Sequence, residues 1–160
     1  AKTDRLYTKR YEDETNLRCH MILDNSASMY YPELKNLSID NLNKIGFGVL
    51  SIAALMQILK KQRDAVGLSI YSDTYNFHAN EKSSERHFQM LYSKLNEVSE
   101  IKNTSQTTKT YTFLHQIAEK IHRRSLIFLF SDMFQTETEE DRLFEALRHL
   151  KCCGSFSFAG

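Results

Sequence analysis

The chain has 160 residues, of which 41% are hydrophobic and 26% are charged, and its formal net charge is +1. This length and composition predict a single globular domain over 1–160, large enough to bury a core. The balanced charge excludes the basic footprint of a nucleic-acid-binding protein, and no apolar run approaches the ~20 residues of a membrane span. Three cysteines without metal-ligand spacing favour a reducing compartment. Because the chain opens on Ala1 without an initiator methionine, we expect a fragment with both ends truncated.

The first two predicted elements are a buried strand and an amphipathic helix. Residues 17–23 form a short apolar run closed by a polar turn, which predicts a central strand with Cys19 buried inside it. Over 39–59, apolar residues recur at three- and four-residue steps, which predicts a helix packed against a sheet. Gly46 and Gly48 in its first turns either allow a close approach to that sheet or are simply tolerated.

A hairpin and a second helix follow. Residues 65–71 are mostly apolar, and 75–78 alternate as a half-exposed strand does. The polar turn at 72–74 between them predicts an antiparallel hairpin. Apolar residues at helical spacing over 88–98 then predict the second helix.

The last third of the chain contains a hydroxyl-rich loop, a strand and two helices. Residues 103–112 are dense in threonine and lead into a third helix with apolar residues over 113–121. Residues 126–130 are all apolar, which is typical of a strand buried on both faces. A final helix is expected from about 139 to 151.

This order of elements predicts an α/β fold. Buried strands separated by helices favour an open, mostly parallel, Rossmann-like sheet with helices on both faces and one antiparallel edge hairpin. In such sheets, ligands bind at the carboxyl ends of the strands. Asp24 and Asp132 both directly follow predicted strands, and the threonine-rich loop can reach the same edge.

The segment after the first strand carries oxygen ligands at alternate positions, Asp24, Ser26 and Ser28. In an extended or gently turning segment these side chains face the same way, so they could meet one ion together with Asp132 and a threonine. Oxygen ligands suit Mg²⁺, with Mn²⁺ as a substitute. An open coordination position would then accept an acidic side chain from another protein. The simpler alternative is a capping loop, since serine, aspartate and asparagine favour such positions anyway.

The motif "LDNSASM" resembles the Asp-x-Ser-x-Ser signature of von Willebrand factor A-type domains, which carry a metal-ion-dependent adhesion site. The stretches "AKTDRLYTKRYEDETNLRCHMILDNSASM", "KKQRDAVGLSIYSD" and "SLIFLFSDMF" resemble the bacterial domain-of-unknown-function 58 family. That resemblance covers about 1–151. It implies a cytoplasmic A-type domain, often encoded beside a MoxR-type AAA+ ATPase, with a role in protein or complex assembly. Matched by position, it implies a metal site made of five residues, Asp24, Ser26, Ser28, Thr108 and Asp132, with Thr107 as the alternative threonine.

Two features depart from the family pattern. The family usually has Gly-Thr-Asp at the threonine loop, whereas this chain has Thr107-Thr108-Lys109, and a lysine in place of an acid weakens metal binding. After Lys151 the family would supply another apolar strand, for which "CCGSFSFAG" is a weak substitute. We therefore expect an incomplete edge of the sheet.

The predicted function is a non-enzymatic, Mg²⁺-dependent protein-binding module without nucleic-acid or membrane contact. The alternative is a Mg²⁺-dependent phosphatase-like hydrolase that uses Asp24, but Ser26 stands where an Asp-x-Asp-x-Thr motif needs its general acid. Neither a Gly-x-Ser-x-Gly elbow nor a nucleotide-binding glycine loop is present. The histidines lack metal-ligand spacing, and we expect His20 and His78 to serve packing or to lie at the surface.

Overall fold

The computed structural model describes residues 17–33, 41–72, 77–100, 110–122, 124–133 and 140–159. The strands of its sheet are β1 (Arg18–Asp24), β2 (Ala65–Tyr71), β3 (Phe77–Lys82), β4 (Ser125–Phe130) and β5 (Gly154–Ala159). The helices are the 3₁₀ turn η1 (Ala27–Tyr30), α1 (Lys44–Lys61), α2 (Glu85–Glu100), α3 (Thr110–Lys120) and α4 (Glu140–Cys153). Within these ranges no helix has the length and apolar character needed to cross a membrane.

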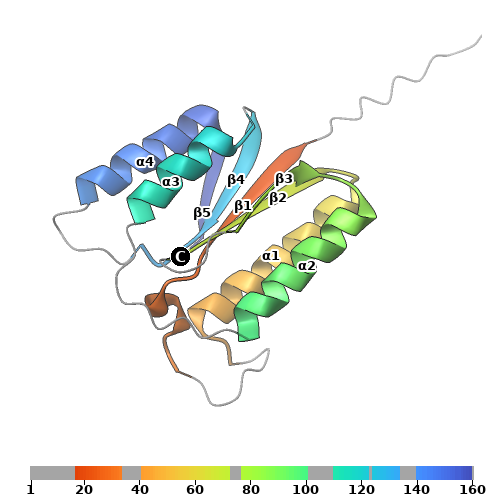
Figure 1. Ribbon diagram of the computed structural model, residues 1–160, viewed down its shortest axis with the longest axis horizontal. Coiled ribbons are helices and arrows are strands. Elements are labelled where there is room, and N and C mark those ends of the chain that lie inside the picture. Colours follow the sequence, from red (N-terminus) through yellow and green to blue (C-terminus); the bar gives the residue numbers. More distant parts are fainter. Residues whose placement is uncertain are drawn as a thin grey trace, which may run out of the picture.

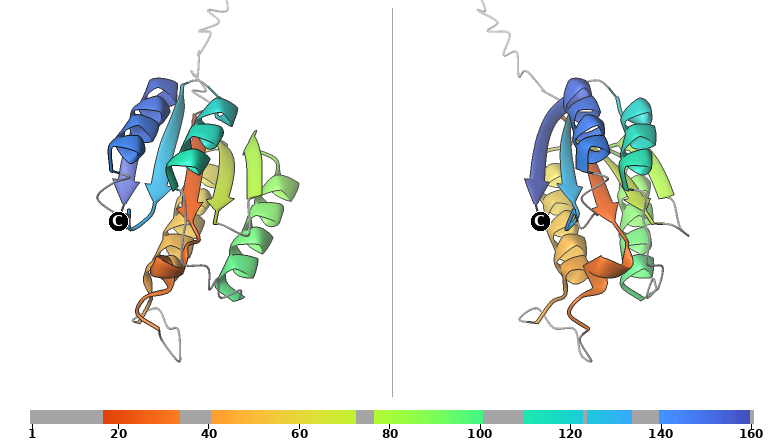
Figure 2. Two further views of the ribbon diagram at one scale, coloured as in Figure 1. Left: turned by 60° about the vertical axis from the view of Figure 1, so that its left-hand side comes forward. Right: turned by 90° about the vertical axis from the view of Figure 1, so that its left-hand side faces the viewer.

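The five strands form one sheet in the order β3-β2-β1-β4-β5. β1 pairs in parallel with both β2 and β4, β4 pairs in parallel with β5, and β2 pairs with β3 as an antiparallel hairpin. Figures 1 and 2 show α1 and α2 on one face of the sheet and α3 and α4 on the other. The predicted α/β fold, with its mostly parallel sheet and its edge hairpin, is confirmed.

The prediction of an incomplete sheet edge was wrong. β5 runs beside β4 along its whole length, from Gly154 opposite Ser125 to Ala159 opposite Phe130. Its sequence, 155–158, alternates serine with phenylalanine, which is the period of a strand with two different faces rather than of a buried one. The backbone of β5 satisfies the hydrogen-bonding groups that β4 would otherwise leave open, and this pairing does not require an apolar run.

β1 is apolar because each of its faces supports a separate core. Cys19, Met21 and Leu23 are buried in the core that α1 and α2 cover, whereas Ile22 is buried in the core beneath α3 and α4. The prediction that Cys19 is a small buried hydrophobic side chain is confirmed, since it is fully buried. A strand covered on both faces favours apolar residues until it emerges at its carboxyl end, and the buried His20 within it has hydrogen-bond partners on β2 and β3.

The start of α1 is fixed by a cap and by a close approach to the sheet. Asn43 caps the helix, because its side-chain Oδ1 accepts a hydrogen bond of 2.9 Å from the backbone N of Gly46. A Cβ atom on Gly48 would lie 3.0 Å from Leu23 Cδ1 and 3.7 Å from Phe130 Cβ. Gly48 therefore provides the close approach that the sequence suggested, whereas Gly46 contacts only its own capping segment.

A buried polar network joins β1, β2 and β3. The Nδ1 atom of the fully buried His20 lies 2.7 Å from Glu81 Oε1, and its Nε2 lies 2.7 Å from Ser69 Oγ. Ser69 Oγ also lies 2.8 Å from His78 Nδ1, and the two imidazole rings stack with centroids 5.3 Å apart. Burial tends to raise the pKa of Glu81, but the hydrogen bond from His20, a backbone hydrogen bond and the charges of nearby histidines together outweigh it, so the pKa is lowered. With Ser69 only 1% exposed, the network serves packing, which confirms that expectation for His20.

We predict that Ser69→Ala lowers the free energy of unfolding by about 1–3 kcal/mol, because it leaves the buried Nε2 of His20 and the part-buried Nδ1 of His78 without their partner. Urea denaturation at neutral pH measures this difference. The matched control is Ser99→Ala, at an exposed position of α2 where the hydroxyl donates to Leu95 O of its own helix. Equal stability of the two variants would contradict the assignment of the network as a structural element.

Candidate metal centre

The site is built around the buried carboxylate of Asp24, the last residue of β1. Its side chain is 2% exposed; Oδ1 accepts a 2.9 Å hydrogen bond from the backbone N of Ser26, and Oδ2 accepts a 2.6 Å bond from Ser131 Oγ. Burial raises the pKa of Asp24, the hydrogen bonds from Ser131 and Ser26 lower it in part, and the charge of Asp132 raises it further. The net rise means that these donors compensate the negative charge incompletely, which favours a cation nearby.

The two serines of the motif converge through a turn rather than through an extended strand. Ser26 has an extended backbone, and the next residues form η1. The hydroxyls of Ser26 and Ser28 share a hydrogen bond of 3.1 Å, and Ser28 Oγ donates to Asp132 Oδ1 at 3.2 Å. Asn25 faces elsewhere, since its Oδ1 accepts a 2.6 Å bond from the Tyr30 hydroxyl. The two hydroxyls thus meet through a 3₁₀ turn, whereas the prediction assumed an extended or gently turning segment.

Asp132 follows β4 and brings a second carboxylate to the same sheet edge. Because β1 and β4 pair in parallel with Leu23 opposite Phe130, their carboxyl ends lie side by side. Hydrogen bonds thus link Asp24, Ser26, Ser28 and Asp132, four of the predicted metal ligands. Thr108 and its alternative Thr107 lie outside the described residues.

The sequence did not reveal three other groups at this edge. Lys44, the first residue of α1, places Nζ 2.9 Å from Asp132 Oδ2. Ser131 orients Asp24, and its position directly after an apolar strand was the available signal. The hydroxyl of Tyr71, opposite Asp24 in register, is buried without a well-directed hydrogen bond from the described residues. Its burial and the nearby charge of Asp24 raise the pKa of Tyr71 well above its ordinary value.

This set of donors fits a hard cation. The four linked residues offer only carboxylate and hydroxyl oxygens, which Mg²⁺ prefers. In the described part of the chain, no three His, Cys, Asp or Glu side chains gather as a metal cluster. An ion here would therefore rely on serine hydroxyls and on two acidic residues, and the ammonium of Lys44 now supplies the positive charge beside Asp132.

The fold and this edge define an α/β domain with a candidate cation site where two parallel strands end. The comparison with protein families is specific: the family described as "Protein of unknown function DUF58" matches residues 1–152. The chain belongs to this family, which confirms the resemblance seen in its motifs.

The chain is similar to solved structures, and the first one named here shares its fold. One is an aerotolerance-related membrane protein from Bacteroides fragilis NCTC 9343 with multiple mutations to serines; the TM-score is 0.51 at 13% identity, over 90% of this chain and 92% of that one. Another is the SpRpn10 VWA domain, with a TM-score of 0.46 at 13% identity, over 89% of this chain and 87% of that one. No curated protein matches the chain.

Proposed function

We propose that this protein is a non-enzymatic, Mg²⁺-dependent protein-binding module of the A-domain type, with Mn²⁺ as an acceptable substitute. The observation that carries the proposal is the chain of hydrogen bonds from Asp24 through Ser26 and Ser28 to Asp132. It brings oxygen-bearing side chains from two separate loops together at one edge of the sheet, and the first of its links runs through the backbone N of Ser26. Thr108, or Thr107 in its place, would add an oxygen ligand from a third loop.

The chemistry of this site suits binding rather than turnover. Two carboxylates and neutral hydroxyls leave a divalent ion with residual positive charge and room for an outside ligand. A partner's carboxylate is the oxygen ligand that this charge favours. For the partner itself we propose a protein with an accessible acidic side chain in the cytoplasm, and a MoxR-type AAA+ ATPase as the associated machine. This part of the proposal is supported only by the family resemblance.

Asp24→Ala is predicted to abolish stabilisation by Mg²⁺ while the domain still folds. The parent should gain about 2.7 kcal/mol at a Mg²⁺ concentration 100 times its Kd, since the ion binds only the folded state. Thermal unfolding with and without Mg²⁺ measures the shift in Tm. Asp141→Ala, at an exposed position of α4, is the control and should behave as the parent does. The same Mg²⁺-induced shift in Asp24→Ala as in the parent would show that the site is misassigned.

Lys44→Ala is predicted to tighten Mg²⁺ binding by about two- to fivefold, because the ammonium and the ion compete for Asp132 and a part-exposed pair contributes up to about 1 kcal/mol. The Lys44 side chain is 45% exposed, so its removal leaves the core intact. Isothermal titration calorimetry measures the Kd. Lys60→Ala, which breaks a comparable 2.7 Å ion pair with Glu85, is the control and should leave the Kd unchanged. Unchanged or weaker binding by Lys44→Ala would argue against the competition.

The alternative, a phosphatase-like hydrolase, predicts steady hydrolysis of phosphate esters, whereas a binding module predicts none. With Ser26 in place of a second acid beside Asp24, we expect no steady turnover of a generic phosphomonoester such as p-nitrophenyl phosphate in Mg²⁺. Release of p-nitrophenol measured over many enzyme equivalents tests this. Steady hydrolysis that Asp24→Asn abolishes would overturn the binding proposal in favour of an enzyme.

A further inference from the structure

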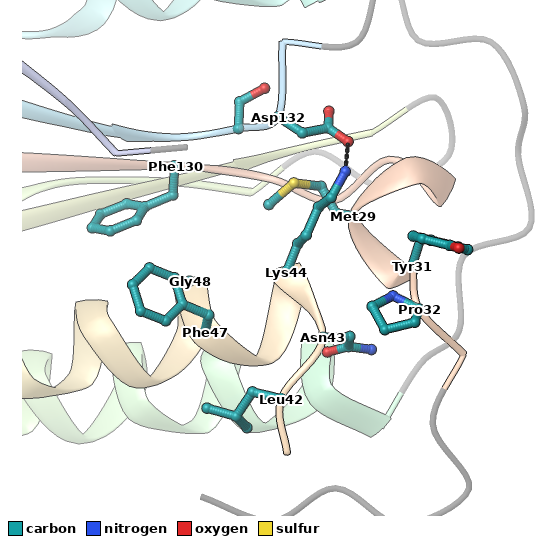
Figure 3. A pocket seen from close by; sticks show the side chains of 11 residues that line it. Met29, Tyr31, Pro32, Leu42, Asn43, Lys44, Phe47, Gly48, Phe130 and Asp132 are labelled. Carbon is teal, nitrogen blue, oxygen red and sulfur yellow. Dashed lines mark hydrogen bonds and ion pairs between the residues drawn. The ribbon is translucent and has the colours of Figure 1, made fainter. Parts of the chain in front are cut away.

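A pocket of about 470 Å³ opens directly beside the candidate metal centre, a size suited to a bound group. Its apolar wall is made of Met29, Tyr31, Pro32, Leu42, Phe47 and Phe130. Figure 3 shows Phe130 on the sheet side and Phe47 on α1, with Tyr31 and Pro32 on the segment after η1. Asp132 and Lys44 line the same pocket, so the apolar wall and the candidate metal centre are continuous.

The wall combines a buried floor with an exposed rim. Met29 and Phe130 are only 3% and 4% exposed, whereas Phe47 and Tyr31 are 56% and 69% exposed. Large apolar side chains that remain exposed around a concave surface mark a binding site more often than isolated ones do. Gly48 also lines the pocket, at a position where a Cβ atom would lie 3.0 Å from Leu23 Cδ1.

The two ends of the pocket differ in charge. At one end, Lys44 extends from α1 to Asp132 (Figure 3), and their 2.9 Å Nζ–Oδ2 ion pair carries no net charge. The proposed Mg²⁺ would therefore supply the positive charge at this end of the pocket. Asn43 and Ser131 also line the pocket, and the rest of the wall is formed by apolar and aromatic side chains and by Gly48. A ligand complementary to both ends carries a negative group next to a bulky apolar group.

We propose that this pocket receives a bulky apolar side chain of the same partner segment whose acidic side chain binds at the metal centre, an inference that rests on the proposed function. Because Asp132 belongs to both, the acidic and the apolar residue of the partner lie within about two positions of each other along its chain, given at most ~3.6 Å per residue. The metal centre would supply the affinity for an acid, and the pocket would select among acidic segments.

The absence of tryptophan from the chain allows a direct test. Phe47→Trp places a single tryptophan on the pocket rim, and Phe144→Trp places one at a matched position of α4 that is 59% exposed, on the opposite face of the sheet. The probes are displayed nonapeptides with a fixed central aspartate and random flanks. They are selected on the parent in Mg²⁺ and counter-selected on Asp24→Ala.

We expect enrichment of leucine, methionine or an aromatic residue at one position within two residues of the fixed aspartate. Alanine at that position of the best peptide should raise its Kd at least about tenfold, as the loss of a buried apolar side chain does. The same peptide should shift the emission of Phe47→Trp to shorter wavelength and leave that of Phe144→Trp unchanged.

Four outcomes would overturn the inference. Enriched peptides without an apolar preference, or without an effect on the tryptophan at position 47, would remove the subsite and leave the proposed function standing. If no peptide binds the parent better than it binds Asp24→Ala, both the subsite and the proposed function are wrong. A shift in Phe47→Trp emission with protein concentration alone would identify a second copy of this chain as the occupant.

Discussion

The arrangement of this sheet edge depends on the carboxylate of Asp24, which the fold buries at the end of β1. A buried charge is costly unless other groups compensate for it, and here the donors come from two places. The backbone of Ser26 holds the turn after β1, and Ser131 holds the chain after β4, where its hydroxyl also accepts a bond of 3.0 Å from Met133 N. The pKa of Asp24 is nevertheless raised, so the compensation is partial. A divalent ion would complete it.

The sheet supplies the geometry that makes one site out of distant segments. Parallel pairing of β1 with β4 aligns their carboxyl ends, and Gly48 lets α1 lie close enough for Lys44 to reach Asp132. Figure 1 shows η1 and the start of α1 at this same end of the sheet. The proposed cation site, the charge of Lys44 and the apolar pocket therefore lie on one small surface, where the proposed partner would contact all of them together.

The elements with strong local patterns were predictable, and those that depend on distant pairing were not. The buried strands were recognised because both of their faces are covered, and the Asp24 motif indicated convergence even though a 3₁₀ turn produces it. β5 was missed because an edge strand with alternating serine carries little apolar signal. The contact between Lys44 and Asp132 spans 88 residues, so no sequence window contains both. The pocket likewise exists only in the folded state, and the role of Thr108 stays a prediction.

The central claim is that these oxygen atoms bind one hard ion. The most direct measurement is the anomalous difference map of crystals grown in Mn²⁺. The account predicts one strong peak within bonding distance of the hydroxyls of Ser26 and Ser28, with Lys44 displaced from Asp132. If crystals in saturating Mn²⁺ show no peak at this edge of the sheet and Lys44 is still paired with Asp132, the proposed ion site is contradicted.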